Sequence, residues 1–274
     1  MPELPEVETI RRDLQHSIVN SRISSVAVLD ARVLRQPVDD FVSRLKGKKI
    51  LRIDRRGKAL IFVLSENEFL VVQVMMTGQL IVDGKEDKPA YQTDKHTRIR
   101  FKLDKGVLLY NDQRVFGQLR VVNDLGTIKH FSLLGPEPFD DGFDRAYIKV
   151  FLKRTMRPIK SILLDHGFVA GIGNIYASEI LFRSGISPMR AGNKVEQSEI
   201  STLLKITRQV LQQAIDLRGS SMRNYRDGAG QKGNFNKAIQ VYARANQPCL
   251  VCKAPIIRLV QGGRSTFYCR KCQK

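Results

Sequence analysis

The sequence predicts an α+β protein of several domains: an N-terminal helix with an antiparallel β-sandwich, then a helical domain, then a small C-terminal β-hairpin. Three observations support this architecture. Eight short β-branched segments follow the first helical stretch, a helical period replaces them after residue 144, and all four cysteines lie beyond residue 248. At 274 residues, the chain is long enough for two domains with separate cores.

The domain boundaries follow from these changes of pattern. We predict an N-terminal β-sandwich domain over residues 1–133, a linker over 134–143, a helical domain over 144–246 and a terminal segment over 247–274. The linker begins with Leu134-Gly135-Pro136-Glu137-Pro138, which breaks both periodicities. A glycine-rich polar stretch over 222–236 predicts a loop near the end of the helical domain.

The first eight residues combine a helix start with unusual chemistry. Apolar residues at 7, 10, 14 and 18 predict an amphipathic helix from Glu6, and two prolines and three glutamates lie among the first eight residues. One interpretation is an ordinary N-terminus, with acidic side chains facing the positive end of the helix dipole. Alternatively, removal of Met1 leaves the secondary amine of Pro2 beside Glu3, the minimum for covalent chemistry on an aldehyde-like carbon.

Gly, Asp and Asn residues separate the short strands that follow, and helices come after them. Close spacing of the strands favours a sandwich or barrel. A short helix begun by Pro37 separates the first two strands. The predicted strands cover 22–29, 49–54, 59–64, 69–74, 79–82, 98–103, 107–110 and 118–122, and the later helices cover 146–153, 158–166, 174–184 and 197–217.

The charge is concentrated in the second half. The chain carries a net charge of +19; residues 1–143 hold 23 basic and 20 acidic side chains, whereas residues 144–274 hold 23 and 7. This imbalance indicates a polyanionic partner. Nucleic acid is favoured over a membrane surface, because no basic amphipathic helix has a wide apolar face. No signal peptide or membrane span is apparent, so we expect a cytoplasmic protein.

The cysteines form two Cys-x2-Cys pairs. Cys249 and Cys252 are separated from Cys269 and Cys272 by sixteen residues, a spacing typical of a four-thiolate zinc site. Two structural disulfides are the alternative, which a cytosolic compartment disfavours. The Gly-Gly pair before Arg264 predicts a hairpin with this arginine at its tip, where it is either solvated or a probe for a DNA groove.

A turn between two helices forms a further candidate DNA contact. Gly171-Ile172-Gly173-Asn174 joins them, and we expect Asn174 to cap the second helix, whose N-terminal amides can receive a phosphate. Lys160 lies on the preceding helix. A plain helical hairpin is the alternative, and the basic charge of this half favours DNA.

Together these motifs resemble the bacterial formamidopyrimidine-DNA glycosylases, which are 8-oxoguanine DNA glycosylases and AP lyases. The resemblance runs from residue 2 to residue 273 in the order of the family's own motifs, so it covers the chain. The matching motifs are Pro2-Glu3-Leu4-Pro5-Glu6, Arg56-Gly57-Lys58, Met76-Thr77-Gly78, Asn111-Asp112-Gln113-Arg114-Val115-Phe116-Gly117, Leu134-Gly135-Pro136-Glu137-Pro138, Gly171-Ile172-Gly173-Asn174-Ile175-Tyr176 and the terminal cysteine ribbon.

The resemblance implies a bifunctional base-excision repair enzyme. Such enzymes excise 8-oxoguanine and formamidopyrimidines from duplex DNA through a Schiff base and cleave the abasic strand by β,δ-elimination. Pro2 matches the nucleophile and Glu3 the proton donor, while Glu6 matches a second carboxylate that orients the site. Lys58 matches the residue assigned to proton transfer in β-elimination, and Arg264 matches the finger arginine assigned to δ-elimination.

The resemblance also implies DNA contacts. Met76, Arg114 and Phe116 match residues that fill the gap left by an everted base; from residue type alone, Met76 and Phe116 belong in the β core. His96, Lys160 and Asn174 match phosphate contacts. The second half then corresponds to a helix-two-turn-helix DNA-binding domain with a base lid at 222–236 and a zinc finger. We expect a monomeric, nucleoid-associated enzyme that binds double-stranded DNA containing oxidised bases, one zinc ion and no membrane.

Five positions depart from the family pattern: Gln73 and Arg98 replace His, Met75 and Ala243 replace Gly, and Val115 replaces a basic residue. They concern the fine geometry around Met76, Arg114 and Phe116 and the preference for the base opposite the lesion. Two alternatives stay open. One is an endonuclease VIII-like glycosylase for oxidised pyrimidines, against which Leu4 argues because that family usually has Gly there. The other is a zinc-ribbon DNA-binding protein without catalysis.

Overall fold

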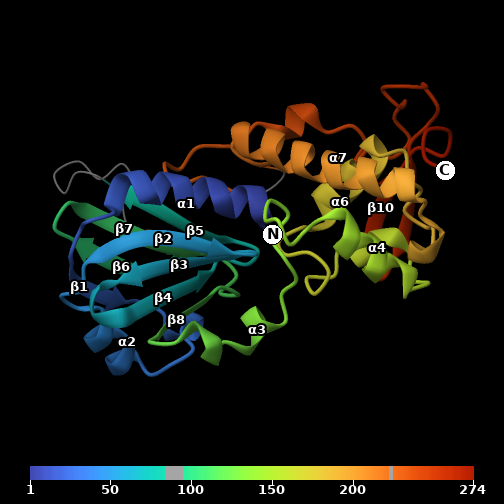
Figure 1. The fold of residues 1–274 in the computed structure, drawn as a ribbon. Coiled ribbons are helices and arrows are strands. Elements are labelled where there is room, and N and C mark those ends of the chain that lie inside the picture. Colours follow the sequence, from blue (N-terminus) through green and yellow to red (C-terminus); the bar gives the residue numbers. More distant parts are fainter. Residues whose placement is uncertain (84–94, 222–224) are drawn as a thin grey trace. The chain divides into compact units, whose positions relative to one another are not determined.

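The computed structural model describes residues 1–83, 95–221 and 225–274 (Figure 1). Contacts divide the chain into two compact units. The first unit contains Met1–Ser132 together with Leu217–Asn234, and the second contains Leu133–Asp216 together with Phe235–Lys274. The segment Leu217–Asn234 therefore belongs with the N-terminal residues, although it directly follows the long helix of the second unit.

The first unit is a sandwich of two four-stranded antiparallel sheets, as the sequence predicts. One sheet has the order β1-β6-β7-β5 and the other the order β2-β3-β4-β8. All eight predicted strands are confirmed within a few residues. They are β1 (Ile23–Val28), β2 (Ile50–Arg56), β3 (Ala59–Leu64), β4 (Glu68–Gln73), β5 (Gly78–Asp83), β6 (Thr97–Leu103), β7 (Gly106–Asp112) and β8 (Gln118–Val122).

Burial along the strands follows the pleat where one face is open to solvent. In β6, residues 97, 99, 101 and 103 are buried and alternate with more exposed basic side chains. In contrast, β3 is buried along its whole length. On its second face, Ala59 and Ile61 belong to a separate apolar cluster with Val71 and Ile128.

Helix α1 (Leu4–Ile18) packs on strands of both sheets, and α2 (Val38–Leu45) packs against β1 and β8 (Figure 1). The apolar side of α1 enters the main core of the sandwich through Val7, Ile10, Leu14 and Ile18. The predicted period is thereby confirmed, and the N-terminus of the chain is attached to a large hydrophobic core.

The second unit is helical and ends in a two-stranded ribbon. Its helices include α4 (Arg145–Lys153), α5 (Ile159–Leu163), α6 (Asn174–Arg183) and α7 (Gln197–Asp216), and β9 (Ile257–Gln261) pairs with β10 (Arg264–Tyr268). Helix α5 ends three residues earlier than predicted. There the Asp165 carboxylate accepts a hydrogen bond from Gly167 N at 2.9 Å, which closes a turn in place of another helical turn.

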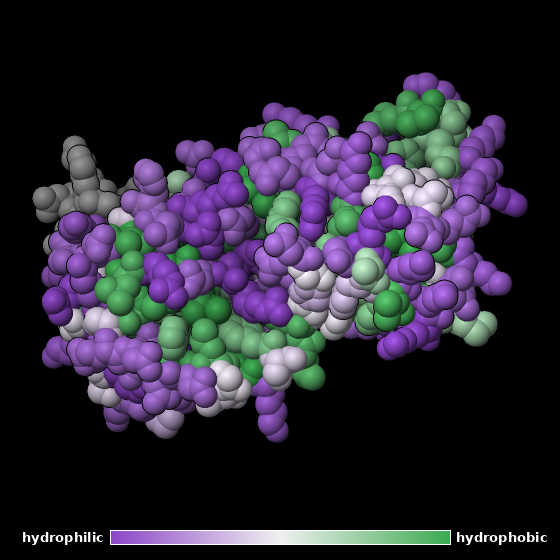
Figure 2. All heavy atoms as spheres, viewed as in Figure 1, coloured by the Kyte–Doolittle hydropathy of each residue, from purple (hydrophilic) through white to green (hydrophobic). Residues whose placement is uncertain are grey.

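Figure 2 shows a face that is largely polar, with apolar areas that include part of the sandwich. Leu250 and Val251, between Cys249 and Cys252, are also exposed. Among the described residues, no helix combines the length and the apolar character needed to cross a membrane.

Candidate active site and nucleic-acid interface

The candidate nucleophile lies at the start of α1. Glu3 occupies the N-cap position and Pro5 the first turn, so the octet is a normal helix start, as one interpretation of the sequence predicts. Met1 is 48% exposed, whereas Pro2 is buried next to two carboxylates that are also buried, Glu3 and Glu6. Burial of two acidic side chains at one helix terminus is costly unless hydrogen bonds satisfy them, and the structure provides such bonds for Glu6.

Glu6 joins the helix start to the segment that follows α7. Its Oε2 accepts a hydrogen bond from Glu3 N at 2.8 Å, and its Oε1 accepts one from Ser220 N at 2.7 Å. Gly219 has φ +77°, and a Cβ there would lie 2.9 Å from Glu6 Cγ, so both the conformation and the space require glycine. Glu6 is therefore fixed as an acceptor that orients the backbone beside Pro2.

Glu8 connects α1 to the turn that carries Lys58. The Glu8 carboxylate pairs with Arg55 Nε at 3.2 Å, and Arg55 Nη1 donates to Gly57 O at 2.9 Å. Burial raises the pKa of Glu8, but hydrogen bonds from Arg11 and other arginines outweigh it and lower the pKa to about 2. Glu8 is thus an anion at neutral pH, and through Arg55 it connects the Gly57–Lys58 turn to the helix.

Lys58 lies in the two-residue turn between β2 and β3, which begins after the pair Arg56–Ala59. Its side chain is half-buried, and Gly57 in the same turn has φ +56°. The turn gives Lys58 a defined position on the unit that also carries Pro2 and Glu3. A partly desolvated lysine amine held in a hairpin turn is suited to transfer a proton.

Three residues that the family resemblance assigns to the gap left by an everted base lie together at one end of the sandwich, in the loops that follow β4 and β7. The Arg114 guanidinium lies 4.5 Å from the centroid of the Phe116 ring, and its Nη1 lies 3.3 Å from Met76 Sδ. Phe116 is 46% exposed and Met76 is half-buried. The expectation from residue type, that both belong in the core, is wrong, because they lie in loops beyond the strand ends. We call Met76, Arg114 and Phe116 the wedge cluster.

Three departures from the family pattern share a backbone feature. Met75, Val115 and Ala243 have φ values of +51°, +57° and +59°. This left-handed region favours glycine, and it is most costly for a β-branched residue such as Val115. The chain therefore keeps a conformation that glycine adopts freely, at some cost in backbone strain.

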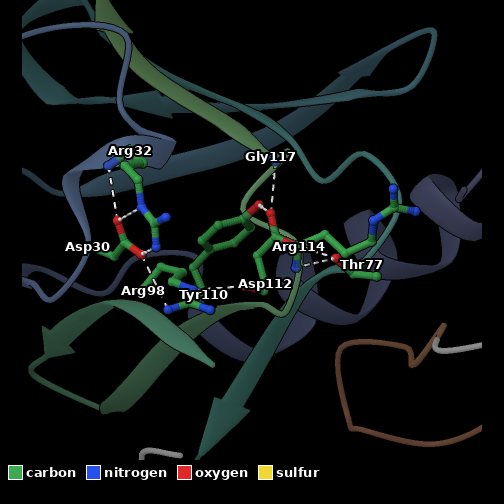
Figure 3. A network of polar contacts seen from close by, with 8 residues as sticks. All are labelled: Asp30, Arg32, Thr77, Arg98, Tyr110, Asp112, Arg114 and Gly117. Carbon is green, nitrogen blue, oxygen red and sulfur yellow. Dashed lines mark hydrogen bonds and ion pairs between the residues drawn. The ribbon is translucent and has the colours of Figure 1, made fainter. Parts of the chain in front are cut away.

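The departure at Arg98 builds a polar network near the wedge cluster (Figure 3). Arg98 Nε donates to Asp112 O at 2.8 Å, and its Nη1 lies 3.3 Å from Asp30 Oδ2. A hydrogen bond from Arg32 lowers the pKa of Asp30 to about 2. His96, the nearby phosphate candidate, is half-buried, and its carbonyl accepts from Asp112 N at 2.9 Å.

Two candidate phosphate contacts of the second unit bind its own ribbon. Lys160 is 1% exposed, and its Nζ donates to Ser265 O at 3.0 Å and to Thr266 Oγ1 at 2.7 Å. Asn174 Nδ2 donates to the same Ser265 carbonyl at 2.9 Å. Asn174 is the first residue of α6, and Gly173 before it is the N-cap without a side-chain bond, so the predicted cap is wrong. The Asn174 side chain donates to the Ser265 carbonyl of the ribbon instead of capping α6.

Arg264 begins β10 directly after the turn, as predicted. Gly262 and Gly263 both have positive φ values, +55° and +72°, the conformation that a tight two-residue hairpin needs. Arg264 pairs with Gln261 through the backbone, and its side chain is exposed. Since Lys160 and Asn174 hold the adjacent Ser265, the hairpin presents Arg264 from a fixed strand.

The four cysteines form one cluster, in which their Sγ atoms all lie within 4.8 Å of one another. The Cys249–Cys272 and Cys252–Cys269 sulfur distances are 3.9 and 3.3 Å. All four cysteines are free, so the disulfide alternative is wrong, and their sulfurs lie close enough together to surround one zinc ion. Burial and the neighbouring sulfurs raise the pKa of the Cys272 thiol to about 12, and a bound zinc ion would favour its thiolate.

Several residues of the site were not found by sequence reasoning. Ser220 and Arg55 carry no sequence signal, because each acts through a contact with α1 from far along the chain. Asp112 and Thr77 stand inside the motifs that contain Arg114 and Met76, and that proximity was the only signal available. Residues 225–234 of the predicted lid are described and lie with the first unit, whereas its residues 222–224 lie outside the described residues.

Comparisons with known proteins cover the whole chain. Family models match in order: the formamidopyrimidine-DNA glycosylase N-terminal domain at residues 1–119, its H2TH domain at 134–226, and the zinc finger found in FPG and IleRS at 246–274. A formamidopyrimidine-DNA glycosylase of Pelotomaculum thermopropionicum is 42% identical over 278 residues, covering 100% of this chain and 99% of the relative.

Solved structures agree with this match. The MutM (FPG) protein from Thermus thermophilus superposes with a TM-score of 0.88 at 36% identity, covering 99% of this chain and 98% of that one. Lactococcus lactis Fpg in complex with DNA containing an abasic site gives a TM-score of 0.91 at 34% identity, with 99% of both chains covered. The four-cysteine cluster is accordingly the site of one structural zinc.

Proposed function

The chain belongs to the formamidopyrimidine-DNA glycosylase family, and on that premise we propose that it removes oxidised purines from duplex DNA and cleaves the resulting abasic strand. The observation that carries the proposal is the buried N-terminal site, where Pro2 adjoins Glu3 and Glu6 in a chain that matches all three family domains in order. A relative with this architecture is solved in complex with DNA that contains an abasic site.

Base excision begins at the amine of Pro2 once Met1 is removed. The nitrogen lone pair attacks C1′ of the damaged nucleoside, and the bond between C1′ and the base breaks. Glu3 donates a proton during loss of the base, so the base leaves as a neutral molecule. Glu6 keeps the backbone around Glu3 in place through the bond from Glu3 N.

Strand cleavage follows because Pro2 is a secondary amine. Its adduct opens to an iminium ion, which has no N–H to lose and therefore stays cationic as an electron sink. Lys58 assists removal of a proton from C2′, and the electron pair expels the 3′ phosphate by β-elimination. Arg264 binds the remaining phosphate and assists its departure in the δ-elimination.

The charge and the candidate contacts indicate how DNA is held. Residues 144–274 carry the excess of positive charge, which suits phosphate binding with a steep dependence on salt. We assign Met76, Arg114 and Phe116 to the gap left by the everted base, and His96, Lys160 and Asn174 to the phosphate side of the interface. Because Lys160 and Asn174 both bind Ser265 O, they also position the hairpin of Arg264. We expect a monomer that works on cytoplasmic, nucleoid DNA.

Borohydride trapping on an 8-oxoguanine duplex tests the proposal. The wild-type protein should give a covalent DNA adduct, whereas Pro2→Gly and a form that retains Met1 should give none or only a trace. Pro5→Ala is the matched control, because it changes the other proline of the octet and leaves the amine intact. Absence of an adduct from the wild-type protein would favour a non-catalytic DNA-binding protein, and preference for a thymine-glycol duplex would favour an enzyme for oxidised pyrimidines.

A further inference from the structure

Asp112 is a fully buried carboxylate at the end of β7, and it accepts four hydrogen bonds (Figure 3). Its Oδ1 accepts from Thr77 Oγ1 and, at 3.2 Å, from Arg114 N. Its Oδ2 accepts from Gly117 N at 2.8 Å and from Tyr110 Oη at 3.3 Å. A carboxylate is costly to bury, and these four donors offset that cost.

The donors belong to the two loops that carry the wedge cluster. Thr77 directly follows Met76, and Arg114 donates through its own backbone N–H. Gly117 directly follows Phe116, so the two bonds that the Asp112 carboxylate accepts from Arg114 N and Gly117 N hold that loop on both sides of Phe116. We propose, on the basis of the proposed function, that Asp112 is a positioning residue that holds Met76, Arg114 and Phe116 in the geometry needed to replace an everted base.

The backbone of both loops is strained, so the loops need contacts such as those made by this carboxylate. Met75 and Val115 have left-handed φ values, and each directly adjoins a wedge residue. Such conformations persist only where surrounding contacts over-determine them. The bonds from Arg114 N and Gly117 N to Asp112 lie on either side of Val115 and supply that constraint.

The packing around the carboxylate leaves no room for another arrangement. A Cβ at position 117 would lie 1.5 Å from Tyr110 Oη and 3.0 Å from Asp112 Oδ2, so only glycine admits this approach. Burial, and then the charge of Asp112, raises the pKa of Tyr110, which keeps its hydroxyl protonated as a donor. Asparagine at position 112 would retain one acceptor and direct an NH2 group at donors that already point inward.

The position of Asp112 in the sheet is fixed independently of its side chain. Its backbone N–H donates to His96 O at 2.9 Å, and its carbonyl accepts from Arg98 Nε at 2.8 Å. The carboxylate therefore extends from a fixed strand to two loops that would otherwise relax. Loss of the carboxylate should disturb the loops and leave the sandwich folded.

Two duplexes separate positioning of the wedge from catalysis. An 8-oxoguanine duplex requires eversion of a stacked base, whereas a duplex with a preformed abasic site has no base to evert. In single-turnover assays, Asp112→Asn should lower excision of 8-oxoguanine by about 100-fold, because a small misplacement of a positioned group has effects of that size. Cleavage of the abasic duplex should change by less than about threefold, since no base is unstacked.

A matched pair at Thr77 makes the test independent of how well Asp112→Asn folds. Thr77→Val removes one donor to the carboxylate and should lower excision about tenfold, whereas Thr77→Ser keeps the hydroxyl and should stay within about threefold of wild type. A 2-aminopurine next to the lesion reports insertion of the wedge. Its fluorescence rise should be slower in Asp112→Asn and Thr77→Val, and normal in Thr77→Ser.

The outcomes distinguish this proposal from the proposed function. If the wild-type protein fails to excise 8-oxoguanine, the proposed function is wrong. If the wild-type protein is active and both Thr77→Val and Asp112→Asn match it on the lesion duplex, the positioning role alone is refuted. Equal losses on the lesion and abasic duplexes also refute it, because they indicate a general defect.

Discussion

The two ends of the chain carry the candidate nucleophile and the candidate finger arginine, and they are stabilised in opposite ways. The start of α1 is anchored in the main hydrophobic core of the sandwich, which the helix enters through Val7, Ile10, Leu14 and Ile18. Among the described residues, the cluster that contains the C-terminal ribbon has six buried members. Two are the cysteines Cys249 and Cys269, and Phe182 comes from α6. The first end is held by apolar burial and hydrogen bonds, whereas the second needs a metal.

This difference shows how each end can present a reactive group. At the N-terminus, Glu6 and Glu8 fix the backbone and the Lys58 turn, so the amine of Pro2 rests on a rigid helix that needs no cofactor. In the ribbon, Arg264 extends from a short hairpin whose strands are too few to fold alone. The two ends should therefore lose their structure under different conditions: the ribbon on removal of the metal, and the N-terminal site on loss of its carboxylate contacts.

Removal of the metal should have the largest effect and should affect only the ribbon. A structural zinc contributes on the order of 10 kcal/mol to folding of such a module, so chelation or Cys272→Ser should unfold it. Amide resonances of residues 249–272 should collapse to random-coil positions, while those of the sandwich keep their dispersion. Zinc should be present at about one ion per chain, and restoring it should restore the ribbon. A metal-free protein with an intact ribbon spectrum would contradict this picture.

Loss of one carboxylate at the other end should have an intermediate effect that depends on pH. Glu8→Gln should lower the free energy of unfolding by about 1–2 kcal/mol at pH 7, after allowance for solvent screening. The folded protein lowers the pKa of Glu8 from 4.5 to about 2. This stabilisation is therefore complete above pH 4.5, and it is lost as the pH falls toward about 2.

Urea unfolding at a series of pH values measures this difference between wild type and Glu8→Gln. Glu66→Gln is the matched control, because Glu66 pairs with Lys48 through a side chain that is 72% exposed. Its effect should stay below about 0.5 kcal/mol at every pH. A difference for Glu8→Gln that does not change between pH 7 and pH 2.5 would show that the carboxylate is not the source of the stability.

Arg264→Ala should have the smallest effect on stability, below about 0.5 kcal/mol, because the side chain is exposed at a hairpin tip. Its effect should appear in the reaction products. β-Elimination should continue while the δ-elimination product becomes scarce, as gel analysis of the cleaved strand can show. Arg258→Ala, an exposed arginine on the paired strand, should leave the ratio of products unchanged. An equal change in the product ratio for both variants would indicate that positive charge on the ribbon, and not the position of Arg264, promotes δ-elimination.

Most of the fold could be predicted from the sequence because its signals are local. The apolar period of α1 and the alternation in β6 follow from short stretches of chain. The zinc ligands follow from two spacings, and the exposed tip at Arg264 follows from a Gly-Gly turn. The resemblance to a family then supplied roles for residues whose type alone does not define them.

The family-matched residues Phe116 and Asn174 mark the limit of local reasoning. An aromatic residue beside a strand belongs in the core by type, yet Phe116 is 46% exposed, since the chain turns at Val115. Asparagine at the start of a helix suggests a cap, yet Asn174 donates to Ser265, 91 residues further along the chain. In both cases a backbone conformation or a distant partner overrides the local preference.

The sequence by itself determined the order of the elements, the ligands of the zinc and the candidate chemistry of Pro2, because these depend on residue type and spacing. Only the tertiary structure revealed that Glu6 accepts from Ser220 across 214 positions and that Asp112 joins two loops. Buried carboxylates need donors wherever the fold can supply them. Four of those donors are the backbone N–H groups of Glu3, Ser220, Arg114 and Gly117. Every residue except proline possesses such a group, so the sequence carries no mark of which ones are used.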